Sequence, residues 1–153
     1  KNGNQSLSMF GSISVTSPET GDSSTTGMVG GSIGSVVTDN VEIELGFTLV
    51  GNESNGSTTS ALFMRPAVKY HFVSSNVTMV PYVGAYGSLG SSESGGFSTS
   101  MYGGGVSAGA NMFISENVAF YPEAQFEALT VDSSGATSTS TSFNVIAGLR
   151  AFF

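Results

Sequence analysis

The sequence predicts an all-β fold, an eight-stranded antiparallel up-and-down transmembrane β-barrel that takes up residues 1–153 as a single domain. Apolar and polar residues alternate with the period of two that is typical of strands, and no segment has the helical period. Three tetrapeptides share the pattern hydroxyl residue, any residue, Asn, Val: Thr38–Val41, Ser74–Val77 and Ser115–Val118. Stretches rich in Ser, Gly, Thr and Asn lie between them. Short turns that alternate with longer polar loops are the plan of a membrane barrel.

Alternating runs, separated by these turn signals, are the expected strands. In the clearest run, 41–49, Ile43 and Leu45 share one face while Glu42 and Glu44 lie on the other. In chain order the runs are 5–16, 25–37, 41–49, 59–72, 77–89, 98–114, 118–131 and 143–153. Longer polar loops are expected at 17–24, 51–58, 90–97 and 132–138, which places both termini on the side of the short turns.

Two kinds of local irregularity are expected. The alternation turns Lys69 and His71 toward the polar side, whereas an alignment of the three tetrapeptides turns them the other way. We follow the alternation and expect a bulge or an extra turn residue near Val73. Local bulges are also expected on the apolar face, at the prolines that interrupt strands and remove a ladder N–H: Pro66, Pro81 and Pro122.

Composition narrows the class of protein. Only 10% of the residues are charged, against about a quarter in soluble domains. No stretch approaches the ~20 consecutive apolar residues of a membrane helix. The net charge of -7 argues against nucleic acid as a partner. Because there is no Cys and only one His, thiolate and multi-His metal sites are excluded, and no cofactor is expected.

The placement of charge separates a membrane barrel from a soluble one. Every charge within a predicted strand lies on the polar face, and a charge on the lipid face would cost about 2–4 kcal/mol at the bilayer midplane. A soluble β-barrel or sandwich also alternates, but its solvated face is usually rich in charge. This polar face is mostly Ser, Thr, Gly and Ala, which suits an enclosed lumen. The expected lumen charges are Glu42, Glu44, Arg65, Lys69, Glu123, Glu127 and Arg150.

Hairpin pairing predicts how these charges meet. Pairing across the middle of 51–58 brings Glu44 near Arg65, and pairing of the last two strands brings Glu123 near Arg150. We interpret the charges as an ionic core that replaces a hydrophobic one, because buried charges persist when they are paired. A charged constriction in a channel is the alternative. Small interior residues, Gly105 among them, suggest the further hypothesis of water-filled pockets above and below the ionic cluster.

Three segments resemble the small outer-membrane β-barrel family that includes OmpA-like, OmpX-like and OmpW-like proteins. They are Val37–Gly46, similar to a periplasmic turn and the following strand, Pro81–Ala85, similar to the fifth strand, and Gly148–Phe153, similar to the C-terminal assembly signal. The resemblance implies a bacterial outer-membrane location with periplasmic termini. It implies membrane lipids, lipopolysaccharide and the assembly machinery as partners. The assembly-signal residues would be Phe143, Val145, Leu149 and Phe153. Because Trp is absent, an aromatic girdle would use Phe with Tyr70, Tyr82, Tyr102 and Tyr121.

Some barrels of this kind modify lipid A with a His, a Ser and an acid near the extracellular end. Here the only His, His71, is expected near the periplasmic end of its strand, as a half-buried or turn-proximal structural residue. We therefore predict a non-enzymatic, structural or surface-exposed outer-membrane barrel with a polar, ion-paired lumen. A small porin-like channel for ions or polar solutes is the alternative, and a soluble secreted binding module is a third interpretation.

Overall fold

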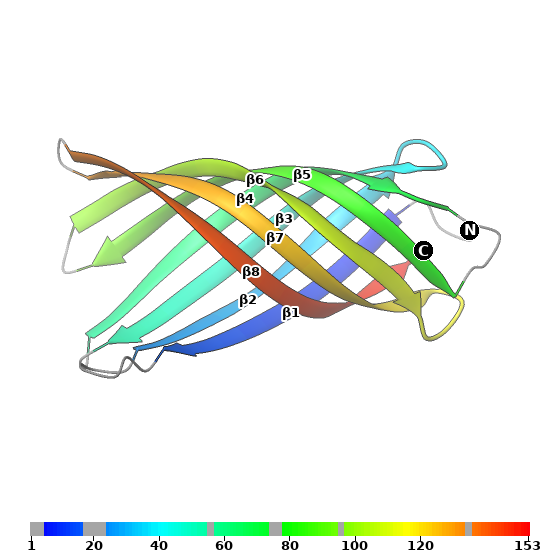
Figure 1. Ribbon diagram of the computed structural model, residues 1–153, viewed down its shortest axis with the longest axis horizontal. Helices are drawn as coiled ribbons and strands as arrows, with labels where there is room; N and C mark the ends of the chain where they lie inside the picture. Colours follow the sequence, from blue (N-terminus) through cyan, green and yellow to red (C-terminus); the bar gives the residue numbers. More distant parts are fainter. Residues whose placement is uncertain (1–4, 17–23, 55–56, 74–77, 95–96, 134–135) are drawn as a thin grey trace.

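The computed structural model describes residues 5–16, 24–54, 57–73, 78–94, 97–133 and 136–153. Eight antiparallel strands follow one another around a closed barrel, with β1 paired to β8, so the predicted fold is confirmed (Figure 1). The strands are β1 (Gln5–Thr16), β2 (Ser24–Val36), β3 (Val41–Ser54), β4 (Ser57–His71), β5 (Met79–Ser94), β6 (Phe97–Phe113), β7 (Val118–Ser133) and β8 (Ala136–Phe152).

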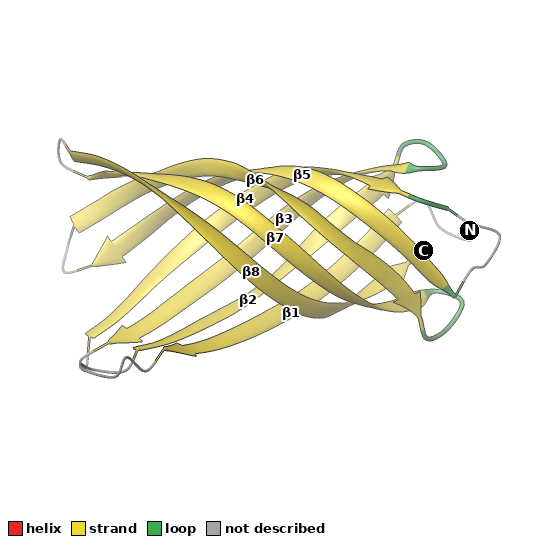
Figure 2. Ribbon diagram, viewed as in Figure 1, coloured by secondary structure: helices red, strands yellow, loops and turns green. Residues whose placement is uncertain are grey.

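Strands account for nearly all of the described chain (Figure 2). Within that part, no helix is long and apolar enough to cross a membrane. The strands reach further than predicted: Ser54 lies opposite Ser57, Ser94 opposite Phe97, and Ser133 opposite Ala136. Most of the residues expected in loops at 51–58, 90–97 and 132–138 are therefore paired, and this part of the prediction is wrong. The segments lack alternation because both of their faces are polar, while Thr still suits a pleated strand.

The hydroxyl residue of the turn tetrapeptide closes the turn. The backbone N–H of Val41 donates to the Thr38 hydroxyl at 3.2 Å. The N–H of Val118 donates to the Ser115 hydroxyl at the same distance. Each turn thus uses a side chain to satisfy a backbone group at the point where a strand begins.

The turns also bind the neighbouring strand. The Asn carbonyl accepts the N–H of the last residue of that strand: Asn40 from His71 at 2.7 Å, and Asn117 from Phe152 at 2.8 Å. In the middle turn Thr78 has this role, 3.0 Å from the N–H of Phe113, and β5 begins at Met79 instead of Val77. Residues 72–78 separate β4 from β5, whereas 37–40 and 114–117 suffice elsewhere. The interval between β4 and β5 is thus longer than the other two, in agreement with the extra turn residue expected near Val73, while Ser74–Val77 themselves lie outside the described residues.

The prolines do not change the register of the strand pairs. Leu45 lies opposite Pro66, Pro81 opposite Ala110, and Pro122 opposite Ala147, and the register is the same on both sides of each. The bulges predicted at Pro66, Pro81 and Pro122 are therefore wrong. The β4–β5 ladder skips Pro66 and the β6–β7 ladder skips Pro122, yet both resume in register. A missing N–H leaves a local gap, and the bonds on either side hold the strands in place.

The seam between β1 and β8 closes only at one end. Ser6–Gly11 pair with Ala147–Phe152, but Ser12–Thr16 do not pair with the facing part of β8, although both segments continue their strands. The β1–β2 and β7–β8 hairpins lie apart at the end of the barrel away from the termini (Figure 1). This half of the seam is an open strand edge.

Most large apolar side chains face outward and the interior is mainly polar, with Phe63, Val80 and Ile146 among the buried apolar exceptions. The buried charged or basic side chains include Glu42, Lys69, His71, Glu123 and Arg150. The outward side chains form what we call the apolar belt, which contains large, exposed residues from every strand: Met9, Ile33, Phe47, Leu62, Leu89, Val106, Phe126 and Phe143. The barrel is thus inverted relative to a water-soluble β-protein, in which the packed face is the apolar one.

Candidate functional site: the ion-paired interior

The strand alternation delivers the predicted lumen charges to the interior from β3, β4, β7 and β8. Glu42 and Arg150 have no exposed surface, and Lys69, Glu123 and Glu127 are at most 4% exposed. Water therefore solvates these charges little, and their interactions with one another decide whether the barrel tolerates them.

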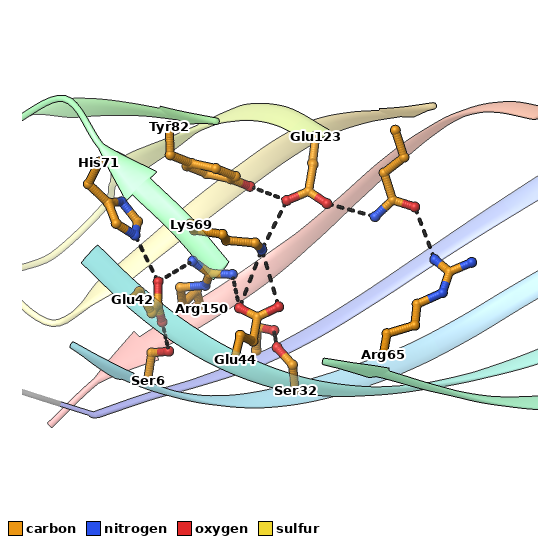
Figure 3. Close-up of polar contacts among 12 residues, drawn as sticks. Ser6, Ser32, Glu42, Glu44, Arg65, Lys69, His71, Tyr82, Glu123 and Arg150 are labelled. Carbon is orange, nitrogen blue, oxygen red and sulfur yellow. Dashed lines mark hydrogen bonds and ion pairs between the residues drawn. The ribbon is translucent and has the colours of Figure 1, made fainter. Parts of the chain in front are cut away.

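Glu42, Glu44, Lys69, Glu123 and Arg150 form what we call the inner cluster (Figure 3). The Arg150 guanidinium lies 3.2 Å from a Glu42 oxygen and 2.6 Å from a Glu44 oxygen. The Lys69 ammonium lies 3.2 Å from Glu44 and 3.0 Å from Glu123. Each base thus bridges two carboxylates, and the charges form a continuous chain across the lumen.

Arg65 and Glu127 form the outer pair, with 2.7 Å between their nearest nitrogen and oxygen. Arg65 also donates to the Gln125 carbonyl at 3.1 Å, and the Gln125 amide donates to Glu123 at 2.6 Å. Gln125 thereby joins the outer pair to the inner cluster. The sequence prediction missed this residue, although its place between Glu123 and Glu127 on the polar face of β7 was a signal for it.

The predicted partners were wrong although the faces were right. Glu44 lies opposite Ala67 and pairs with Lys69 and Arg150, so the Glu44–Arg65 pair does not form. Arg65 pairs with Glu127 from the far wall. Glu123 lies opposite Ile146 and pairs with Lys69, so the predicted Glu123–Arg150 pair is also replaced. The register differs from the predicted pairing by two residues in the β3–β4 ladder and by four in the β7–β8 ladder, and an even change of register keeps every face while it changes every partner.

His71 belongs to the same interior. Its Nε2 lies 2.8 Å from one oxygen of Glu42, and the Ser6 hydroxyl donates to the other oxygen. At 3% exposure His71 is more buried than the half-buried residue predicted. The carboxylate stands between the hydroxyl and the imidazole, whereas an activated serine needs direct contact with its base. This order of groups satisfies a buried carboxylate and does not make a nucleophile.

Aromatic rings cover the bases. The Arg150 guanidinium lies 4.9 Å from the ring centroid of Tyr121 and 5.7 Å from that of Tyr82. Arg65 lies 5.2 Å from the Tyr86 ring. Tyr82 and Tyr121 are 1% exposed, so the prediction that they belong to a girdle is wrong. Cation–π contacts of this kind favour a cation that has lost its water.

Interior glycines provide the room for these rings. A Cβ on Gly109 would lie 2.7 Å from the Tyr82 hydroxyl, and one on Gly105 would lie 2.7 Å from that of Tyr86. A Cβ on Gly148 would lie 2.8 Å from the Tyr121 ring. These three glycines, which are among the small residues that suggested open pockets, are thus packed against large neighbours on adjacent strands. A cavity of about 40 Å³ remains between the inner cluster and the outer pair.

Other candidate features lie elsewhere on the barrel. The predicted assembly-signal residues Phe143, Val145, Leu149 and Phe153 are all more than half exposed, on the outside. Among the described residues, no group of three or more His, Cys, Asp or Glu side chains could hold a metal ion.

Neither the family models nor the curated proteins compared with the chain match it. Several solved structures do match the chain. Neisserial surface protein A is 19% identical, with 97% of this chain and 95% of that chain covered and a TM-score of 0.68. The N-terminal β-barrel domain of Pseudomonas aeruginosa OprF is 18% identical, with 99% and 98% covered and a TM-score of 0.60. The outer membrane protein OprG of the same species is 13% identical, with 99% and 97% covered and a TM-score of 0.59. The chain therefore has the fold of the small eight-stranded outer-membrane barrels, as its sequence predicted.

Proposed function

We propose that the chain is an integral protein of the bacterial outer membrane, non-enzymatic and structural or surface-exposed, with a lumen closed by ion pairs. One observation carries the proposal: the barrel exposes apolar side chains on every strand and buries its lumen charges in ion pairs. Soluble proteins rarely expose contiguous apolar surface beyond a few hundred Å². A bilayer is the solvent that makes this arrangement favourable.

The strand lengths support a membrane span with a polar rim. A tilted strand needs about 9–11 residues to cross the hydrocarbon, and these strands have 12 to 17. Beyond the apolar belt, outward positions near the hairpin tips are polar: Glu53, Ser60, Ser91, Ser100, Asp132 and Thr139. We infer that this rim lies on the extracellular side, with the tetrapeptide turns and both termini in the periplasm.

The charge on the outside constrains the partners. In the described part of the chain every Lys and Arg points into the lumen, so the outer charges are acidic. We infer that the barrel contacts lipids and lipopolysaccharide through acyl chains, because its described residues present no base to their phosphates. The assembly machinery would recognise the outward residues of β8, Phe143, Val145, Leu149 and Phe153.

The inner cluster and the tyrosine rings that pack against interior glycines close the lumen. We therefore expect that it does not conduct. The runner-up function, a small channel for ions or polar solutes, draws support from the polarity of the lumen and from its residual cavity. The two functions differ in planar-bilayer recordings of the purified protein. Membrane insertion with no conductance steps supports a closed barrel, and reproducible steps favour the channel.

Insertion itself needs a separate check. A membrane barrel requires detergent for extraction and changes its mobility on SDS gels when it is boiled. Protein that stays soluble without detergent and shows no such shift would contradict the membrane assignment.

A further inference from the structure

The residual cavity between the inner cluster and the outer pair coincides with unsatisfied polar atoms. Thr48 Oγ1, Arg65 Nε and Tyr86 Oη are buried and have no hydrogen-bond partner in the protein. All three residues line the cavity, and they come from three consecutive strands, β3, β4 and β5. Thr48 is 1% exposed, so bulk water does not reach its hydroxyl from outside. Buried polar groups are rarely left without a partner.

The donor set specifies what can bind. Arg65 Nε–H can only donate, while the two hydroxyls can donate or accept. The other two guanidinium nitrogens of Arg65 are already engaged by Gln125 and Glu127. A ligand at this position must therefore accept a hydrogen bond from Arg65 and exchange hydrogen bonds with the hydroxyls of Thr48 and Tyr86.

The charged side chains around the cavity exclude an ion as its ligand. The Arg65 charge is balanced by Glu127 at 2.7 Å, and the cavity is also lined by Glu44 and Glu123, so an anion would join a surplus of carboxylates. A cation would face the Arg65 N–H and the Lys69 ammonium, which lines the same cavity. The ligand is therefore small and neutral. A buried water needs about 10–15 Å³ of cavity, so about 40 Å³ holds roughly three.

We propose that Thr48, Arg65 and Tyr86 form an internal hydration site, which holds a cluster of roughly three water molecules between the inner cluster and the outer pair. The waters complete the hydrogen bonding of the lumen and connect its two ionic layers. This site differs in its position from the predicted pockets, because it lies between the two charged layers instead of above and below the ionic cluster.

The test counts long-lived internal waters in the wild-type protein in detergent micelles by oxygen-17 relaxation dispersion, together with NMR magnetisation transfer from water to Thr48. We expect roughly three such waters and a transfer signal at Thr48. In Thr48→Val with Tyr86→Phe the count should fall by two or more. Thr141→Val, the same change at an exposed outer position, should leave it unchanged.

Two results would overturn the proposal. A dry cavity would give no transfer at Thr48 and the same count in the double variant, and the wild-type measurement shows this even if the variant does not fold. An anion site would make the Tyr86 hydroxyl signal depend on whether chloride or a bulky organic anion is the salt.

Discussion

Arg150 is the residue on which the interior depends most. It has no exposed surface and lies between Glu42, Glu44 and two tyrosine rings. Arg150→Met would leave two buried carboxylates without their shared base, and breaking a buried pair in this way typically costs about 3–5 kcal/mol. Reversible urea unfolding in lipid vesicles measures the loss. Glu116→Gln in an exposed turn is the control, with a change within about 0.5 kcal/mol. A loss of less than 1 kcal/mol for Arg150→Met would contradict an ionic core.

The interior glycines that lie against tyrosine rings lead to a second prediction at the residue scale. In Gly109→Ala the new methyl group would lie 2.6 Å from the Pro122 carbonyl and 2.7 Å from the Tyr82 hydroxyl. Overpacking of this kind costs about 1–3 kcal/mol. Gly51→Ala is the matched control, because a Cβ there meets nothing within 4 Å. Equal unfolding free energies for the two variants would show that the ring of Tyr82 does not need the glycine.

At the scale of the strands, the β1–β8 seam leads to a prediction about backbone protection. Ala147–Phe152 are paired with β1, whereas Ser142–Ile146 have β7 on one side and an open edge on the other. In hydrogen exchange, the Ser142–Ile146 amides that point toward the seam should exchange at least tenfold faster than those that point toward β7. Uniform protection through β8 would mean that the seam pairs along its whole length in a membrane.

The last strand also has a role to test in assembly. Phe153→Ala removes an exposed terminal ring, so it should reduce the amount of folded protein in the outer membrane several-fold while leaving the urea midpoint of the folded fraction nearly unchanged. Phe72→Ala, which removes a half-exposed ring directly after β4, is the control. The heat-dependent SDS-gel shift reports the folded fraction. A similar loss for both variants would point to general destabilisation in place of recognition.

Strand faces could be predicted from the sequence, and strand registers could not. The period of two placed Lys69 and His71 in the interior correctly, against the alignment of the tetrapeptides. It could not locate the hairpin centre within the Ser/Thr-rich stretch, where both faces are polar, so Glu44 was assigned the wrong base. The contact between Gly109 and Tyr82 could not be predicted for the same reason, because it depends on the β5–β6 register.

At the scale of the whole molecule, the proposed function has a bilayer take the place of the hydrophobic core. The interior contains ion pairs, rings and glycines, and the apolar belt faces outward on every strand. Carboxylates and bases are retained in the interior where each has a partner, and in the proposed function the apolar surface is stabilised by lipid. The inverted arrangement explains how 10% charged residues suffice for a barrel of this length.

The most direct measurement of that arrangement is a scan with a fluorescent label on single cysteines, since the chain has none of its own. Labels at Ile43, Phe47 and Leu49 on β3 should be quenched by brominated lipids and protected from iodide in water. Labels at Glu53 and Glu116 should show the opposite. Iodide quenching at Ile43, Phe47 and Leu49, with no effect of the lipid, would contradict the claim that this barrel spans a membrane.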